Sequence, residues 1–242
     1  MQLVMVHGAG GSGLSFYYQV SALPGADAMD LPGHPRGKPC PTIEEYVQWL
    51  RGYIAGRGYS DVVLAGHSMG GAIAMLYALE HSEDLKGLVL MSTGARLRVD
   101  PNQLRFLKER APRDMDTWLR QREEGLSKVA PQVRELLLQR SREVGPLVQL
   151  NDLLACDRFD VMERVGEIRV PTLVWYGTED TLTLPRYGEY LASHIPGARA
   201  MVVKGATHQA HLECPDQANA AIKEFLATLG GAGASRPGHG AR

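Results

Sequence analysis

The 242-residue sequence predicts an α/β fold, with a mostly parallel sheet covered by helices on both faces. Apolar runs of strand length alternate along the chain with amphipathic stretches of helix length, as in a series of β-α-β units. The runs at 62–66 and 85–93 contain one charged residue between them, which is typical of strands buried on both faces. Strand-like runs stop at residue 97 and resume at residue 169, so we expect a helical insertion into this fold.

The first elements are indicated by local signals. Residues 2–6 (QLVMV) form an apolar run that ends at HGAGGSG, a loop too rich in glycine to continue a strand. A short strand is expected within residues 26–30. Thr42 and Glu45 have the spacing of a capping box, and apolar residues recur at helical spacing after them. Residues 42–58 are therefore predicted to form an amphipathic helix.

The insertion alternates charged residues with Leu, Val and Met, which predicts amphipathic helices. It is broken by four prolines, Pro101, Pro112, Pro131 and Pro146. After it, strands are expected at 169–177 and 198–206, and a last helix at 217–229. The predicted domains are a core of residues 1–96 and 169–229, a helical cap or lid of residues 97–168, and a disordered tail of residues 230–242.

Composition excludes several classes of protein. The formal net charge is -1, and no basic stripe with interleaved aromatic residues indicates a nucleic-acid partner. No apolar run is long enough to cross a bilayer, and the N-terminus is typical of a strand rather than a signal peptide, so no membrane partner is expected. Cys40, Cys156 and Cys214 are widely spaced and form no CxxC pair. We expect reduced thiols in a cytoplasmic protein, with no disulfide and no metal site.

The stretch AGHSMGG places Ser68 between a strand and a predicted helix at 70–82. Gly66 and Gly70 flank the serine at the two positions where a side chain would collide with the neighbouring elements of a tight turn. Such a turn raises the serine hydroxyl above the carboxyl end of the sheet, at a helix N-terminus that favours developing negative charge. The alternative is a glycine-rich turn with an incidental serine.

These motifs resemble the α/β-hydrolase superfamily, in particular its small esterase and lactonase-like members with a helical lid. The resemblance covers residues 2–229 and depends on HGAGG, DLPGHPRG, AGHSMGG, YGTED and THQAHLECP, in the family's order. It implies an α/β-hydrolase fold with the lid inserted after the sixth family strand. Family members commonly carry two further strands before the HG loop, whereas six residues precede His7 here. We therefore expect about six strands, an edge strand near residues 26–30, and a monomer or a homodimer that protects that edge.

The resemblance also implies the catalytic residues. The family order of nucleophile, acid and base gives Ser68, Asp180 and His208, with Glu179 as the rival acid. His208 follows Thr207, where the family commonly has glycine, and His211 is expected to pack and to form hydrogen bonds. The tight turn around the nucleophile is called the nucleophile elbow in this family, and here it is formed by Gly66, His67 and Gly70. His34 and His67 are expected to form structural hydrogen bonds.

An acyl-transfer site also needs donors for the oxyanion. The expected donors are the backbone N–H groups of Met69 and Ala9, with Gly10 as a second candidate in the same loop. A phosphate-binding role for that loop is disfavoured, because the Walker lysine and the G-x-G-x-x-G spacing are absent from the sequence.

The substrate pocket is the least defined part of the sequence. Met115, Trp118, Leu119 and Met162 are candidates for its apolar lining, with helical core packing as the alternative role. Between Arg96 and Arg169 the chain has 15 basic and 13 acidic residues, a mixture that does not indicate an ionic substrate.

The resulting hypothesis is a cofactor-free serine hydrolase that cleaves small-to-medium carboxylic esters or lactones through an acyl-enzyme. C–C bond hydrolases and thioesterases of the same fold are alternatives, and His67 before the serine favours an esterase by analogy with the family. A receptor that closes its lid on a small ligand with slow or single turnover is an alternative of another class.

Overall fold

A computed structural model describes residues 1–231 of the chain. Six strands form one sheet in the order β2-β1-β3-β4-β5-β6, and every pairing between these strands is parallel. The strands are β1 (Gln2–Val6), β2 (Asp27–Ala28), β3 (Val62–His67), β4 (Leu85–Met91), β5 (Thr172–Gly177) and β6 (Arg199–Val203). The predicted parallel sheet of about six strands is confirmed, with the short β2 at one edge.

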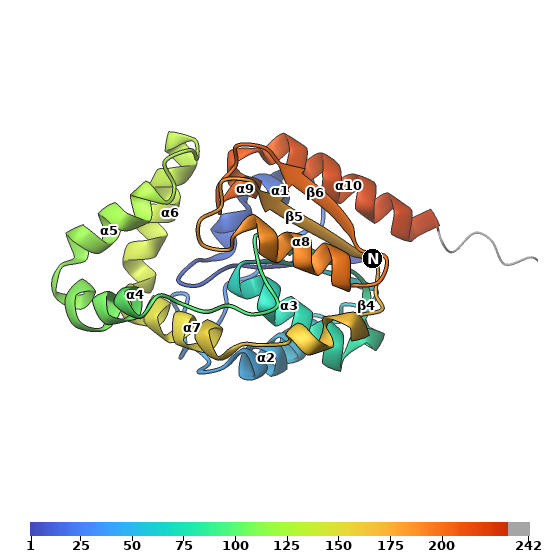
Figure 1. The fold of residues 1–242 in the computed structure, drawn as a ribbon, viewed down its shortest axis with the longest axis horizontal. Helices are drawn as coiled ribbons and strands as arrows, with labels where there is room; N and C mark the ends of the chain where they lie inside the picture. The colour runs from blue at the N-terminus through green and yellow to red at the C-terminus, as the bar shows by residue number, and fades with distance from the viewer. Residues whose placement is uncertain (232–242) are drawn as a thin grey trace, which may run out of the picture.

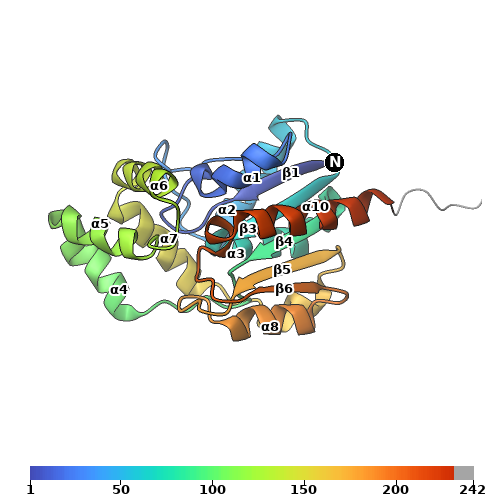
Figure 2. The same ribbon diagram turned by 90° about the horizontal axis from the view of Figure 1, so that it is seen from above.

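Helices cover both faces of this sheet (Figures 1 and 2). Val4 and Val6 of β1 belong to the core beneath α2 (Ile43–Gly56), α3 (Met69–Glu80) and α8 (Pro185–His194). Leu3 and Met5, which alternate with them, belong to the opposite core, formed with α1 (Tyr17–Ala22), α9 (Ala210–Glu213) and α10 (Pro215–Gly231). β3 is apolar up to His67 because its side chains enter the two cores alternately, Val62 and Leu64 the first and Val63 and Ala65 the second.

Helix ends follow the local signals in the sequence. The Thr42 hydroxyl accepts a hydrogen bond from the Glu45 N–H at 3.2 Å and caps α2, as its capping-box spacing predicts. At the other end of the chain, α10 continues to Gly231, two residues into the segment that we expected to be disordered. Residues 232–242 of that segment lie outside the described part of the chain.

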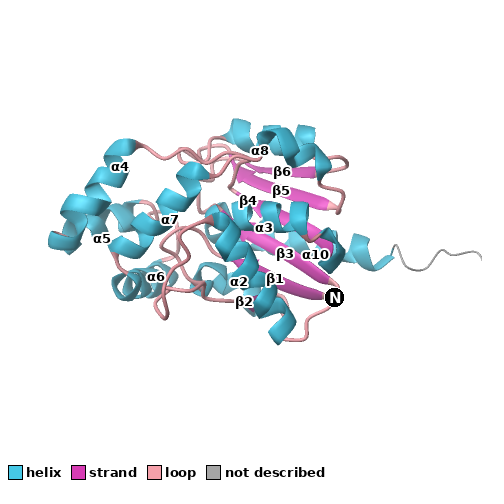
Figure 3. Ribbon diagram, turned by 90° about the horizontal axis from the view of Figure 1, so that it is seen from below, coloured by secondary structure: helices cyan, strands magenta, loops and turns pink. Residues whose placement is uncertain are grey.

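Between β4 and β5 the chain forms helices that lie beyond the carboxyl ends of the strands (Figures 1 and 3). The main ones are α4 (Pro101–Arg105), α5 (Met115–Glu124), α6 (Pro131–Val144) and α7 (Pro146–Arg158). Three of the four prolines in this segment are the first residues of helices, where proline lacks only an N–H that has no helical partner anyway. These prolines therefore start helices as well as separating them.

The structure also bears on membrane-spanning helices and on the state of the three cysteines. None of the helices within residues 1–231 combines the length and the apolar character needed to span a membrane. Cys40, Cys156 and Cys214 are all free thiols.

Candidate active site

Ser68 lies at the turn between β3 and α3 in a conformation that few residues adopt. Its φ is 54° and its ψ is -116°, in a region that is strained for a residue with a side chain. A Cβ on Gly66 would lie 2.1 Å from the Gly70 carbonyl oxygen, and a Cβ on Gly70 would lie 2.0 Å from the Val6 carbonyl oxygen. Only glycine fits at these two positions, because real Cβ atoms do not approach backbone oxygens so closely.

The neighbouring strand holds this turn in place. The Ser68 N–H donates to the Met91 carbonyl at 3.0 Å, and the Thr93 hydroxyl donates to the Ser68 carbonyl at 2.7 Å. The Ser68 side chain is partly exposed, although the residues on either side of it are buried. Its hydroxyl therefore sits at the N-terminus of α3 and is open to a reacting group.

His208 and Asp180 come from the loops after β6 and β5 and face each other. His208 Nδ1 lies 2.9 Å from Asp180 Oδ2. Asp180 also accepts hydrogen bonds from the N–H groups of Leu182 and Thr183, both at 2.9 Å, and from the Thr183 hydroxyl at 2.8 Å. Burial by itself raises the pKa of Asp180, but the hydrogen bonds from His208, Thr183 and Leu182 outweigh it and hold that pKa below its ordinary value. The carboxylate is thus kept charged beside the imidazole.

Glu179, the rival acid, points to a different partner. Its carboxylate accepts from Lys128 Nζ at 2.7 Å, and both side chains are about half exposed to solvent. Of the two candidate acids, the structure brings only Asp180 to His208.

Two buried histidines support the loop that carries His208. The His67 ring, next to the serine, contacts the His208 carbonyl through Nε2 at 2.9 Å, and the His211 ring contacts the Ser15 carbonyl through Nε2 at 3.0 Å. Burial lowers the pKa of His67 well below its usual range and that of His211 to about 3. Both imidazoles are therefore neutral and able to donate to these carbonyl groups.

The candidate backbone donors for an oxyanion differ in whether their N–H groups are already hydrogen-bonded. Within residues 1–231, the N–H groups of Ala9 and Met69 have no hydrogen-bond acceptor. The Gly10 N–H, which was the second candidate from this loop, donates to Asp152 Oδ2 at 2.8 Å. Because that bond occupies it, Gly10 is not a free donor, and Ala9 and Met69 are the two candidates that the geometry retains.

Asp152, on α7, is a site residue that the sequence analysis missed. It is fully buried, and it also contacts His34 Nε2 at 2.8 Å and accepts from the Tyr46 hydroxyl at 2.7 Å. The sequence does contain a signal that position 152 is buried: Ala155 and Cys156, three and four residues later, lie on the same buried helix face. An acid at such a position needs partners, and here they come from three segments distant in the sequence.

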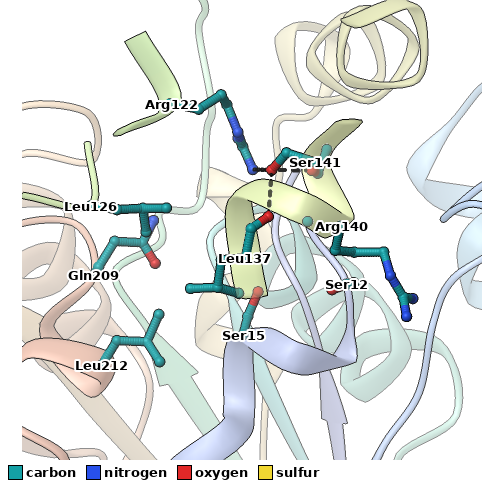
Figure 4. Close-up of a pocket in the computed structure, with 11 residues that line it drawn as sticks. Ser12, Ser15, Arg122, Leu126, Leu137, Arg140, Ser141, Gln209 and Leu212 are labelled. Carbon is teal, nitrogen blue, oxygen red and sulfur yellow. Dashed lines mark hydrogen bonds between the residues drawn. The ribbon is translucent and has the colours of Figure 1, made fainter. Parts of the chain in front are cut away.

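The four residues proposed for the substrate pocket do not line the cavity beside the site. Trp118 is buried with Met115 and Leu119 in a separate cluster, where its indole N–H donates to the Gln149 side chain at 2.7 Å, and Met162 packs against the main core. The cavity that adjoins the loop after β1 is lined by other residues of the described chain (Figure 4). The same helical spacing of apolar side chains also packs the inserted helices together, so a role for these four residues in the substrate pocket stays a prediction.

Comparison with known proteins gives the same fold and names several relatives. A family model described as "Alpha/beta hydrolase family" matches residues 3–221. A pimeloyl-[acyl-carrier protein] methyl ester esterase of Neisseria meningitidis is 26% identical over 244 residues, covering 93% of each chain. A 2-hydroxy-6-oxo-6-phenylhexa-2,4-dienoate hydrolase of Comamonas testosteroni is 30% identical over 251 residues, covering 93% of this chain and 87% of the other. A solved thermophilic esterase is 33% identical, with a TM-score of 0.81 over 95% of this chain and 90% of that one.

The matched region contains the sheet except for Gln2 at the start of β1, and it includes the Ser68, Asp180 and His208 positions. Together with the elbow and the parallel six-stranded sheet, this match shows that the chain belongs to the alpha/beta hydrolase family.

Proposed function

We propose that this enzyme is a serine hydrolase that cleaves carboxylic esters, with Ser68 as nucleophile, His208 as general base and Asp180 as the residue that orients the base. The observation that carries the proposal is the 2.9 Å contact between His208 and Asp180, together with a serine in a strained turn whose neighbour His67 contacts the His208 carbonyl at 2.9 Å. Strain of this kind persists only where the surrounding structure enforces it, and it is common at catalytic centres.

In the proposed reaction, His208 takes the proton of the Ser68 hydroxyl while Oγ attacks the ester carbonyl. The negative charge that develops on the carbonyl oxygen is stabilised by the N–H groups of Met69 and Ala9 and by the N-terminus of α3. The imidazolium then gives its proton to the leaving alcohol, and the acyl group stays on Ser68. A water molecule, deprotonated by His208, hydrolyses this acyl-enzyme and restores the free serine.

The relatives support an ester as the substrate and are also compatible with the alternative reactions. The Neisseria and thermophilic relatives are named esterases, whereas the Comamonas relative is a hydrolase of a dienoate. C–C bond and thioester cleavage therefore remain alternatives within the same proposal. We also propose that α4–α7 act as the lid and that their position beyond the carboxyl ends of the strands limits the substrate to small or medium size.

Compartment and assembly are further parts of the proposal. Three free cysteines fit a reducing cytoplasm. The edge strands are the two-residue β2 and the five-residue β6, and we propose a monomer or a homodimer.

A time course with p-nitrophenyl acetate and butyrate at pH 7–8 tests the reaction. Sustained turnover by the wild type that is lost in Ser68→Ala supports the proposal, and Ser193→Ala, on the exposed side of α8, is the matched control that should retain activity. A burst of one equivalent followed by a stall would favour the ligand receptor. Turnover of thioesters or dienoates but not of these esters would favour the two other chemistries.

A further inference from the structure

Arg122, on α5, is a half-buried cation for which the proposed reaction has no use. Its Nη2 atom donates to the Gly10 carbonyl at 3.1 Å and lies 3.3 Å from the Ser141 hydroxyl (Figure 4). Its Nε atom is enclosed and has no hydrogen-bond acceptor within residues 1–231. An enclosed donor without a partner costs free energy, so this N–H is available to an acceptor on a bound ligand.

The charge of Arg122 is also uncompensated. In the part of the chain that the structure describes, no carboxylate forms a salt bridge with it. Asp152 is an acid whose charge acts on it, but hydrogen bonds from Gly10, His34 and Tyr46 already occupy the two Asp152 oxygens. Burial lowers the pKa of Arg122 to about 10, against the opposing effect of Asp152, so the guanidinium is charged at neutral pH.

Arg140 is the other arginine that lines the cavity shown in Figure 4, and its charge is compensated by carboxylates. Arg140 pairs with Asp30 at 2.8 Å and with Glu143 at 3.1 Å, and Figure 4 shows its guanidinium turned away from Arg122. Arg122 is therefore the cation that the cavity offers to a ligand.

The cavity lies against the proposed catalytic residues. It has a volume of about 30 Å³, and its walls include Gly10, which follows the oxyanion donor Ala9, and Gln209, which follows His208. Its polar lining is completed by Ser12, Ser15 and Ser141, and its apolar lining consists of Leu126, Leu137 and Leu212. A space of this size admits a small polar group rather than a long acyl chain.

We propose that Arg122 binds a carboxylate of the substrate, and that the preferred substrates are esters that carry such a carboxylate a few atoms from the ester group. This inference rests on the proposed ester hydrolysis. A carboxylate is a planar acceptor that matches the guanidinium fork, and it supplies the one negative charge that Arg122 lacks. The leucines exclude water from the pair, which strengthens it.

The test compares two p-nitrophenyl esters of equal chain length, mono-p-nitrophenyl glutarate and p-nitrophenyl pentanoate, on the wild type and on Arg122→Gln. We expect the wild type to have at least a tenfold higher kcat/KM for the glutarate ester. Arg122→Gln should remove most of that preference, mainly by raising KM for the glutarate ester, and Arg122→Lys should restore part of it. Arg120→Gln, an exposed arginine on the same helix, is the matched control and should keep the preference.

Two outcomes would overturn the inference. One is equal kcat/KM of the wild type for both esters; the other is an equal loss on both esters in Arg122→Gln, which would mean that Arg122 only supports Gly10. If the wild type hydrolyses neither ester, the proposed function fails, and the carboxylate site is then tested by binding alone. Glutarate should raise the Tm of the wild type but not that of Arg122→Gln, and no shift in the wild type would refute the site.

Discussion

The Gly10 N–H and the Asp152 carboxylate form a 2.8 Å hydrogen bond between residues that are 142 positions apart in the sequence. This bond ties the loop after β1 to α7, and Arg122 on α5 binds the carbonyl of the same glycine. The inserted helices therefore hold the loop that carries Ala9 through both backbone groups of one residue, Gly10. The position of the proposed oxyanion donor depends on residues outside the core sheet.

Asp152→Asn should reduce both activity and stability. The amide nitrogen cannot accept from the donors that now converge on the carboxylate, so a buried donor is left without a partner. We expect the free energy of unfolding to fall by about 1.5–3 kcal/mol, and kcat to fall roughly tenfold with a smaller change in KM. Urea unfolding and steady-state kinetics measure the two effects. Asp116→Asn, an exposed acid on α5, should change neither, and unchanged kcat in Asp152→Asn would exclude a positioning role.

Asp180→Asn should lower kcat far more than the neighbouring substitution Glu179→Gln. The asparagine cannot hold His208 in the tautomer that accepts the serine proton, and the expected loss is about 10³–10⁴-fold. Glu179→Gln removes only an exposed pair with Lys128, so activity should stay within about threefold of the wild type. Similar losses in the two variants would mean that the acid has been misassigned.

Stability should decline steeply in mild acid because of the buried histidines. Burial lowers the pKa of His7 to about 4 and that of His211 to about 3, whereas both titrate near 6.5 in the unfolded chain. Below pH 6.5 the unfolded state therefore binds more protons, and each histidine removes roughly 1.4 kcal/mol of stability per pH unit until its folded pKa is reached. Urea titrations between pH 7 and pH 4.5 should show this slope, and a His211→Gln variant should show a shallower one. If the stability of the wild type did not change with pH in this range, His7 and His211 would not be the buried neutral groups described here.

Gly70→Ala should prevent the tight turn at Ser68 from forming in the folded protein. The added Cβ would lie 2.0 Å from the Val6 carbonyl oxygen, so β1 and α3 must separate, at a cost of about 4 kcal/mol or more. Gly52→Ala is the matched control, because nothing lies within 4 Å of its Cβ position and alanine favours the helix by about 0.5–1 kcal/mol. Thermal unfolding of the two variants should give Tm values that move in opposite directions.

The sheet and the elbow could be read from the sequence because their signals are local. A run such as residues 62–66 specifies a doubly buried strand on its own, and Gly66 and Gly70 mark the turn within five residues of each other. Asp152 and Arg122 could not be assigned in this way, since both contact Gly10, in a loop more than 100 positions away. Trp118 shows an ambiguity of another kind, because a large apolar side chain on a helix has the same spacing whether it faces a ligand or a neighbouring helix.

The Asp152 contacts also bear on how this chain can be engineered or recombined. A segment joined to the sheet only at its two ends could be exchanged for that of a relative to change what the enzyme accepts. Here the exchange would remove the acid that satisfies His34 and Tyr46, and it would leave those two groups buried without their partner. A chimaera built on this scaffold must therefore transplant the positions of His34 and Tyr46 together with the helices, or retain an acid at position 152.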